Sequence, residues 1–211
     1  MKPKLKVAIP IIFLAVNFLF VILSFKSSPF SNVLNEHDST MFMYFGKAMN
    51  NGMTPYVDMF DHKGIVLFWI QQIGVSIGFG NFSTGIWIIE ILFYLVTLVF
   101  LYKTCMAITE NKIASSFSIM LLTGAMVIPF SGGNYSEEFA LSFIAVAGYL
   151  FTKILVHEKQ SKLSLVLIGI TGALTFFIRS NMVALWLVFC IYFIFESFRE
   201  KNFKLLFERA L

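Results

Sequence analysis

The chain has few charged residues and few cysteines, and each shortage excludes a class of protein. Asp, Glu, Lys and Arg make up 13% of the 211 residues, about half the share that is typical of a soluble domain. The two cysteines, Cys105 and Cys190, each lie in or beside an apolar run, so no disulfide framework is indicated. The sequence also has no Gly-rich phosphate loop, Cys-x-x-Cys pair or nucleophile elbow, so it lacks the common nucleotide, redox and hydrolase motifs.

Apolar side chains are abundant instead, at 58% of residues including 26 Phe. A helix needs about 20 apolar residues to cross a bilayer, and helices satisfy their own backbone polar groups there. The first apolar run, 7–25, is long for a signal peptide and no small-x-small cleavage site follows it, so we expect a retained helix. The sequence therefore predicts an all-α integral membrane protein, with further apolar runs at 64–80, 83–102, 113–130, 139–156, 163–178 and 182–198.

The distribution of basic residues predicts how the chain is threaded. If 64–80 does not cross, twelve of the sixteen basic residues are cytoplasmic and four are outside: Lys26, Lys47, Lys63 and Arg179. If 64–80 crosses, only Lys2, Lys4, Lys6 and Arg179 remain inside. The positive-inside rule favours the first arrangement, which has six transmembrane helices and both termini in the cytoplasm.

We therefore expect a single membrane domain over 1–211, with a first external loop, 26–82, that carries one or two amphipathic surface helices. One is segment 64–80. The other starts with Asp38 as its N-cap and ends near Asn51 and Gly52, where Gly supplies a left-handed C′ residue. Helical spacing predicts an apolar face for this second helix, formed by Met41, Tyr44, Phe45, Ala48 and Met49.

The predicted outer face collects ionisable residues. Six of the twelve acids lie there, together with two basic residues, Lys63 and Arg179; the acids are Glu36, Asp38, Asp58, Asp61, Glu137 and Glu138. A carboxylate can take a proton from an attacking hydroxyl, and Lys or Arg can hold a phosphate as it leaves. This combination suits transfer of a group from a phosphate carrier at the outer leaflet.

Four sequence blocks resemble one family of membrane enzymes: NEHDSTMFMYFGKAMNNG, GMTPYVDMFDHKGIVLFWIQQIG, NYSEEFALSF and FIRSN. Their order and spacing are similar to those of GT-C superfamily glycosyltransferases, in the protein O-mannosyltransferase-like branch that includes the lipid A aminoarabinose transferases. The resemblance implies an inverting transfer from a polyprenyl-phosphate-linked sugar to a glycan, lipid or protein hydroxyl. It also implies that the chain is the N-terminal module of a longer protein, or an inactive fragment of one.

The resemblance assigns roles to residues of the outer face. Asp38 corresponds to the catalytic base and Lys63 to a residue beside the donor phosphate. We expect Arg179 to help hold that phosphate, and the substrate to be positioned by Tyr56, Asp61, His62, Glu137 and Glu138. No nucleic acid partner is indicated.

Each of these residues also has a structural explanation. Asp38 can be a plain helix N-cap, Asp61 to Lys63 can be a solvated turn, and the two glutamates can complement a helix dipole. Arg179 can mark the outer end of a span. A divalent metal site is conceivable from Glu36, His37, Asp38, Asp61 and His62, but no tight ligand spacing supports it, and no cofactor is predicted.

The rival function is non-enzymatic: a transporter segment or an assembly partner. Transporters usually place polar groups at mid-membrane, whereas here most ionisable residues lie at one face. Glu90 is the exception, because it lies inside the span at 83–102. An intramembrane carboxyl group is a candidate functional residue, although a hydrogen bond to a neighbouring helix would explain it equally well.

Overall fold

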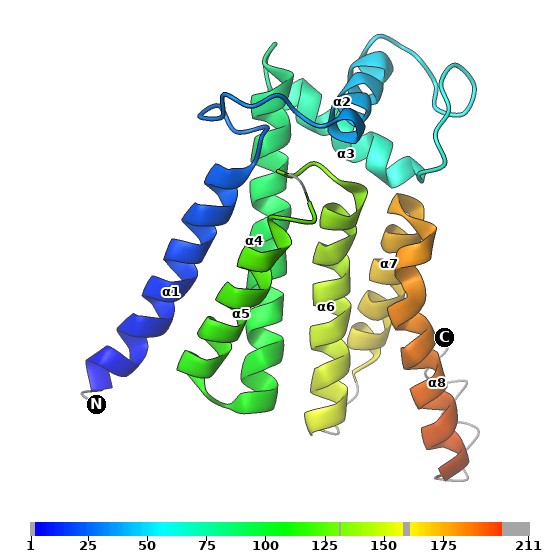
Figure 1. Cartoon of the computed structure of the whole chain (residues 1–211). Helices are drawn as coiled ribbons and strands as arrows, with labels where there is room; N and C mark the ends of the chain where they lie inside the picture. Colours follow the sequence, from blue (N-terminus) through cyan, green and yellow to red (C-terminus); the bar gives the residue numbers. More distant parts are fainter. Residues whose placement is uncertain (1–2, 131, 158–160, 200–211) are drawn as a thin grey trace.

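The computed structural model describes residues 3–130, 132–157 and 161–199, which are helical with connecting loops and no strand (Figure 1). A lone bridge pairs Pro55 with Met59. The helices are α1 (Pro3–Ser24), α2 (His37–Asn50), α3 (Ile65–Ile77), α4 (Phe82–Thr109), α5 (Lys112–Met126), α6 (Ser136–His157), α7 (Lys162–Ile178), the 3-10 helix η1 (Ser180–Val183) and α8 (Ala184–Arg199).

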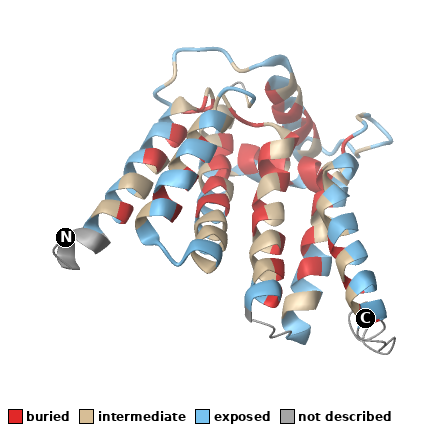
Figure 2. Ribbon diagram, turned by 60° about the horizontal axis from the view of Figure 1, so that its bottom comes forward, coloured by how far each residue is buried: buried red, intermediate tan, exposed pale blue. Residues whose placement is uncertain are grey.

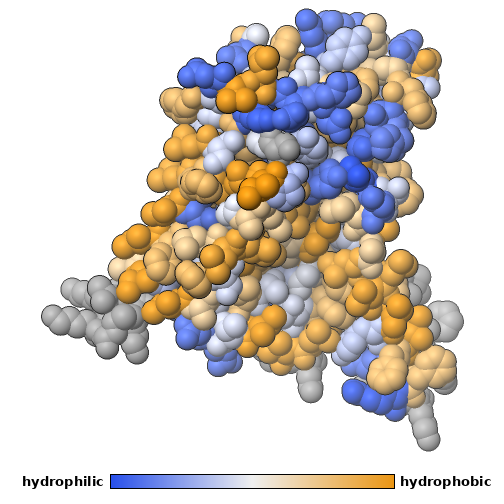
Figure 3. Space-filling view, viewed as in Figure 1, coloured by the Kyte–Doolittle hydropathy of each residue, from blue (hydrophilic) through white to orange (hydrophobic). Residues whose placement is uncertain are grey.

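Six of the helices run side by side, and the short helices α2 and α3 lie together at one end of them (Figure 1). Within the bundle, α4 packs against α6, α6 against α7, and α1 against α5. Buried residues follow the faces where helices meet, while the outer faces are exposed (Figure 2). Those outer flanks are largely hydrophobic, and hydrophilic residues gather toward the ends (Figure 3). This pattern is typical of a bundle that is surrounded by lipid.

Among the residues that the structure describes, three helical segments are long and apolar enough to cross a membrane: α4, the α6 segment Ser136–Val156, and Ser180–Arg199, which joins η1 to α8. The prediction of six such helices is wrong on this measure. The segment Ala8–Ser24 of α1, and helices α5 and α7, are apolar but shorter. The 15 residues of α5 extend about 22 Å, less than the ~30 Å hydrocarbon core. The apolar run at 113–130 overestimated this helix, because α5 ends at Met126 and the chain then turns.

Helix α3 is shorter still. Its 13 residues extend about 20 Å, which is too short to cross the core. Leu67 and Phe68 are almost fully buried, whereas Trp69 and Ile73, one turn apart, are about half exposed. This helix therefore packs into the protein on one side and leaves an apolar strip uncovered on the other.

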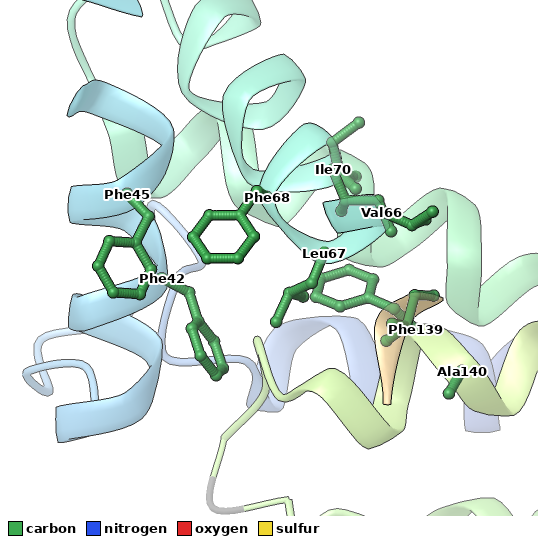
Figure 4. Close-up of a cluster of buried hydrophobic side chains, with 10 residues drawn as sticks. Phe42, Phe45, Val66, Leu67, Phe68, Ile70, Phe139 and Ala140 are labelled. Carbon is green, nitrogen blue, oxygen red and sulfur yellow. The ribbon is translucent and has the colours of Figure 1, made fainter. Parts of the chain in front are cut away.

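The core at this end of the bundle joins α2, α3 and α6. Phe42 and Phe45 of α2 point toward Phe68 and Leu67 of α3, and Phe139 of α6 packs on the same cluster (Figure 4). The Phe45 and Phe68 ring centroids lie 5.1 Å apart. Burying one such side chain contributes roughly 1.5–3 kcal/mol. These contacts fix the two short helices over the ends of the longer ones.

The predicted limits of α2 are confirmed at its end and corrected at its start. The helix ends at Asn50, and Gly52 has a φ of +89°, the left-handed conformation expected after a helix. At the start, however, Glu36 occupies the N-cap without a side-chain hydrogen bond, so Asp38 lies inside the first turn. The predicted apolar face is right for Phe45 and Ala48, but Tyr44 is exposed and the fully buried residue is Phe42.

Candidate functional site

Two loops that carry predicted site residues meet where α3 begins and α7 ends. The Gly64 N–H donates to the Ile178 carbonyl, with a nitrogen–oxygen distance of 3.1 Å. A Cβ atom at Gly64 would collide with the Phe177 carbonyl, so only glycine allows this approach. Lys63 directly precedes Gly64, and Arg179 directly follows Ile178.

Asp61, His62 and Lys63 form a chain of polar contacts. The Lys63 Nζ lies 2.7 Å from His62 Nε2, and His62 Nδ1 lies 3.5 Å from Asp61 Oδ1. An ammonium group only donates, so Nε2 accepts and the imidazole proton is on Nδ1, facing the carboxylate. Asp61 also accepts the Lys63 backbone N–H at 2.8 Å.

Lys63 is only 7% exposed, although lysine is rarely buried without a partner. No carboxylate in the described part of the chain lies within 4.0 Å of its Nζ. Lys63 lines a closely packed pocket together with Asp61, Phe42, Phe45, Leu67, Phe68 and Gln71; its free volume is about 0 Å³, so a bound anion requires side chains of this lining to move. A buried ammonium group without an ion pair is costly, and a bound anion would compensate for that cost.

Tyr56 closes the loop around this lysine. Its hydroxyl donates to the Lys63 carbonyl at 2.6 Å, and its backbone N–H donates to the Met59 carbonyl at 2.7 Å. Burial, and secondarily the negative charge of Asp61, raise the pKa of the Tyr56 phenol above 10.0. Tyr56 therefore stays protonated through the neutral range and acts on the loop conformation. Asp58 has a local role too, since it accepts the Thr54 N–H at 2.8 Å.

Arg179 and Glu137 form the second group of site residues. The Arg179 Nη1 lies 2.6 Å from Glu137 Oε1, and both side chains are 28% exposed. The same nitrogen donates to Ser136 Oγ at 3.1 Å, and Nε donates to Asn181 Oδ1 at 3.1 Å. The ion pair joins the start of α6 to the end of α7. Arg179 is therefore held in place beside the Gly64 contact.

Asp38 lies apart from both groups. Its side chain is 47% exposed, and its Oδ1 lies 3.4 Å from Nδ1 of the neighbouring His37. The next residue, Ser39, is buried, and its backbone carbonyl and hydroxyl oxygen accept the Asn134 side-chain amide at 3.1 and 3.0 Å. The structure thus brings Tyr56, Asp61, His62 and Lys63 together, and joins Glu137 to Arg179. It leaves Asp38 open to solvent.

Glu138 points inward, away from Glu137. Its Oε2 accepts the backbone N–H of Asn134 at 2.9 Å. The Asn134 side-chain oxygen in turn accepts from Gln71 at 2.5 Å. The sequence interpretation missed this network, although Gln71 within an apolar helix and Asn134 after a glycine pair were the available signals. Substrate positioning by Glu138 from the outer face is therefore not favoured by its placement.

The described residues do not contain a group of three or more His, Cys, Asp or Glu side chains that could hold a metal ion. The conceivable metal ligands are dispersed: Glu36 pairs with Lys26, and His37 contacts Asp38. Asp61 and His62 belong to the series of polar contacts that leads to the Lys63 side chain.

Comparison with known proteins shows the family of the chain. The model of one family, described as putative competence-induced protein Ccs4 N-terminal domain, matches residues 2–209. No curated protein matches the chain. No solved structure matches it either.

The resemblance to GT-C glycosyltransferases is therefore wrong, because the family match over residues 2–209 is to a different family. The structure explains why the motif misled. Tyr56, in the block GMTPYVDMFDHKGIVLFWIQQIG, closes a loop, since its hydroxyl donates to the Lys63 carbonyl. Requirements of that kind recur in unrelated folds.

Proposed function

The chain belongs to the family described as putative competence-induced protein Ccs4 N-terminal domain, and from its own side chains we propose that it transfers a sugar from a lipid-linked phosphate donor to an acceptor hydroxyl at a membrane face. The family description names no reaction. The proposal rests on the chemistry of Lys63 and its neighbours.

The observation that carries the proposal is the burial of Lys63, whose Nζ contacts the His62 imidazole and has no carboxylate partner among the residues described. A phosphate would supply the missing negative charge, and charge-assisted hydrogen bonds of this kind contribute about 1.5–3 kcal/mol. Within the described ranges, three helical segments are long and apolar enough to cross a membrane, which favours a donor whose phosphate is attached to a lipid.

The reaction would proceed by displacement at the anomeric carbon of the donor. The acceptor hydroxyl forms the new C–O bond, and the bond between the sugar and the phosphate oxygen breaks with its electron pair leaving on the phosphate. Lys63 stabilises that charge. Asp38, which is half exposed at the start of α2, takes the hydroxyl proton. Arg179 lies beside the same backbone contact and assists once the phosphate draws it from Glu137.

The topology that fits this function has six crossings, in which the shorter helices α5 and α7 cross a locally thinned bilayer, α3 lies flat, and the loops that carry Lys63 and Arg179 are outside. The count of basic residues supports it, since twelve of sixteen are then cytoplasmic. The hydrogen bonds from Asn134 to Ser39 support the placement of the first and second external loops on the same face, because Ser39 lies in the first of these loops and Asn134 in the second.

The test is a transfer assay with the full chain in lipid nanodiscs and a polyprenyl-phosphate-linked sugar as donor. We expect Lys63→Met to reduce transfer at least tenfold without loss of stability, since it removes a buried charge. Asp38→Asn should reduce the rate and leave donor binding unchanged. Lys47→Gln, which alters an exposed lysine of α2, is the matched control. Undiminished turnover by Asp38→Asn would eliminate Asp38 as the base.

A non-enzymatic role, as part of a transporter, is the second candidate. The observation that favours it is Glu90, which is completely buried inside the spanning helix α4. Loss of function in Glu90→Gln, combined with full function in Asp38→Asn and Lys63→Met, would favour transport over transfer.

A further inference from the structure

Two carboxyl groups lie inside the bundle, separate from the Lys63 pocket: Glu90 of α4 and Glu138 of α6. Glu90 is 0% exposed and Glu138 is 5% exposed. The Asn134 backbone N–H donates to Glu138 Oε2 at 2.9 Å, and the preceding Gly133 lies against Glu90, since a Cβ atom there would be 2.2 Å from Glu90 Oε1. The two carboxyl groups therefore share one site at the inner side of the Asn134 loop.

Each carboxyl group has one oxygen in use and one without a partner. The Ser27 hydroxyl donates to Glu90 Oε2. Glu90 Oε1 and Glu138 Oε1 have no hydrogen-bond donor within the described ranges. The side-chain oxygen of Gln71, which is fully buried in the same network, has none either. All three atoms are acceptors, so this network lacks positive charge or donors, which buried polar groups normally find.

Three basic side chains of the loops already have partners: Lys63, which lines a pocket with Gln71, contacts His62, and the other two form ion pairs. Lys26 pairs with Glu36, and Arg179 pairs with Glu137. Over residues 3–130, 132–157 and 161–199, no basic group lies within 4.0 Å of either Glu90 or Glu138. Buried carboxylates are costly unless they are paired or coordinate a metal. The site thus has the composition of a cation site whose counter-charge is not supplied by the protein.

A cavity adjoins Glu138 and limits what can bind beside it. It lies between α1, α4, α5 and α6, and Glu138, Gly133, Tyr94 and Thr97 contribute to its walls. Its free volume of about 30 Å³ is room for about two water molecules. This space is too small for an organic ligand and suits an ion with a water molecule.

We propose that Glu90 and Glu138 bind a small monovalent cation, of the size of sodium, inside the membrane-spanning bundle. Hard cations prefer oxygen ligands, but Ca²⁺ takes six to eight of them and Mg²⁺ usually keeps several waters. Two carboxyl groups beside room for about two waters cannot meet either demand, whereas a monovalent ion carries half the charge and so needs less compensating charge. This site is independent of the proposed sugar transfer.

The experiment measures binding of radioactive ²²Na⁺ to the full chain in lipid nanodiscs, without any donor lipid. We expect saturable binding by the wild type and at least tenfold weaker binding by Glu90→Gln and by Glu138→Gln. The matched control is Glu110→Gln, which removes one exposed acid from the end of α4 and should bind as the wild type does.

A second measurement excludes unfolding as the cause. Gln keeps the shape of Glu and can still accept from Ser27 or Asn134, so both variants should unfold at the wild-type temperature or above it in choline chloride. Sodium chloride should raise the unfolding temperature of the wild type and the control but not that of the two variants. Absence of saturable Na⁺ binding by the wild type, its retention in both variants, or binding of divalent ions alone would overturn the proposal.

Discussion

Replacing Gly64 with alanine should separate the loop that carries Lys63 from the loop that carries Arg179. An added Cβ would collide with the Phe177 carbonyl, and the neighbouring Cα of Phe177 would lie only 2.7 Å away. Both groups belong to the backbone, so no side chain can rotate to make room. Overpacking of this kind costs about 1–3 kcal/mol, and loss of the hydrogen bond from Gly64 to Ile178 adds about 1 kcal/mol. We expect a total destabilisation of about 2–4 kcal/mol.

The assay is thermal unfolding of the full chain in nanodiscs, where a loss of that size corresponds to a decrease of roughly 5–15 °C. Gly169→Ala is the matched control, since it lies on the same helix as Phe177 and a Cβ there meets no atom within 4 Å. That change should be neutral or stabilise by up to about 1 kcal/mol. Equal unfolding temperatures for Gly64→Ala and wild type would refute the close approach and with it the proximity of Lys63 to Arg179.

Three further changes test other contacts by chemical or thermal unfolding. Asn134→Ala should cost about 3 kcal/mol or more, because it leaves buried groups of Ser39 and Gln71 without partners; a loss below 1 kcal/mol would contradict the network. Gly46→Ala should cost about 1–3 kcal/mol, because its Cβ would lie 2.5 Å from the Gln71 carbonyl oxygen; no loss would mean that α2 and α3 are not in contact. Tyr56→Phe should cost about 1 kcal/mol. Because folding raises the Tyr56 pKa, its contribution should be constant below pH 10 and decline above it; a decline that began near pH 8 would contradict that direction.

Local features of the fold were predictable because the residues that determine them are close in sequence. The end of α2 followed from Gly52. The polar contacts that link Asp61, His62 and Lys63 join three consecutive residues. The acids at the start of α6 were recognised for the same reason. The number of helices able to span was overestimated, because an apolar run says nothing about where its helix ends, as α5 shows.

The network around Asn134 could not be predicted, because its partners are distant in sequence. Gln71 lies 63 positions away and Ser39 lies 95 positions away. Glu138 illustrates the difficulty: its position in the first turn of α6 was predictable, but the side to which it points depends on how α4 and α6 pack. Adjacent residues with the same chemistry, Glu137 and Glu138, thus belong to different sites.

The proposed function depends most directly on Lys63 holding a lipid-linked phosphate. The decisive measurement is native mass spectrometry of the full chain with polyprenyl phosphate and, separately, with the polyprenol that lacks the phosphate. We predict that the phosphate form binds at least tenfold more tightly and that Lys63→Met removes this preference while Lys47→Gln preserves it. Equal binding of the two lipids by the wild type would contradict the account.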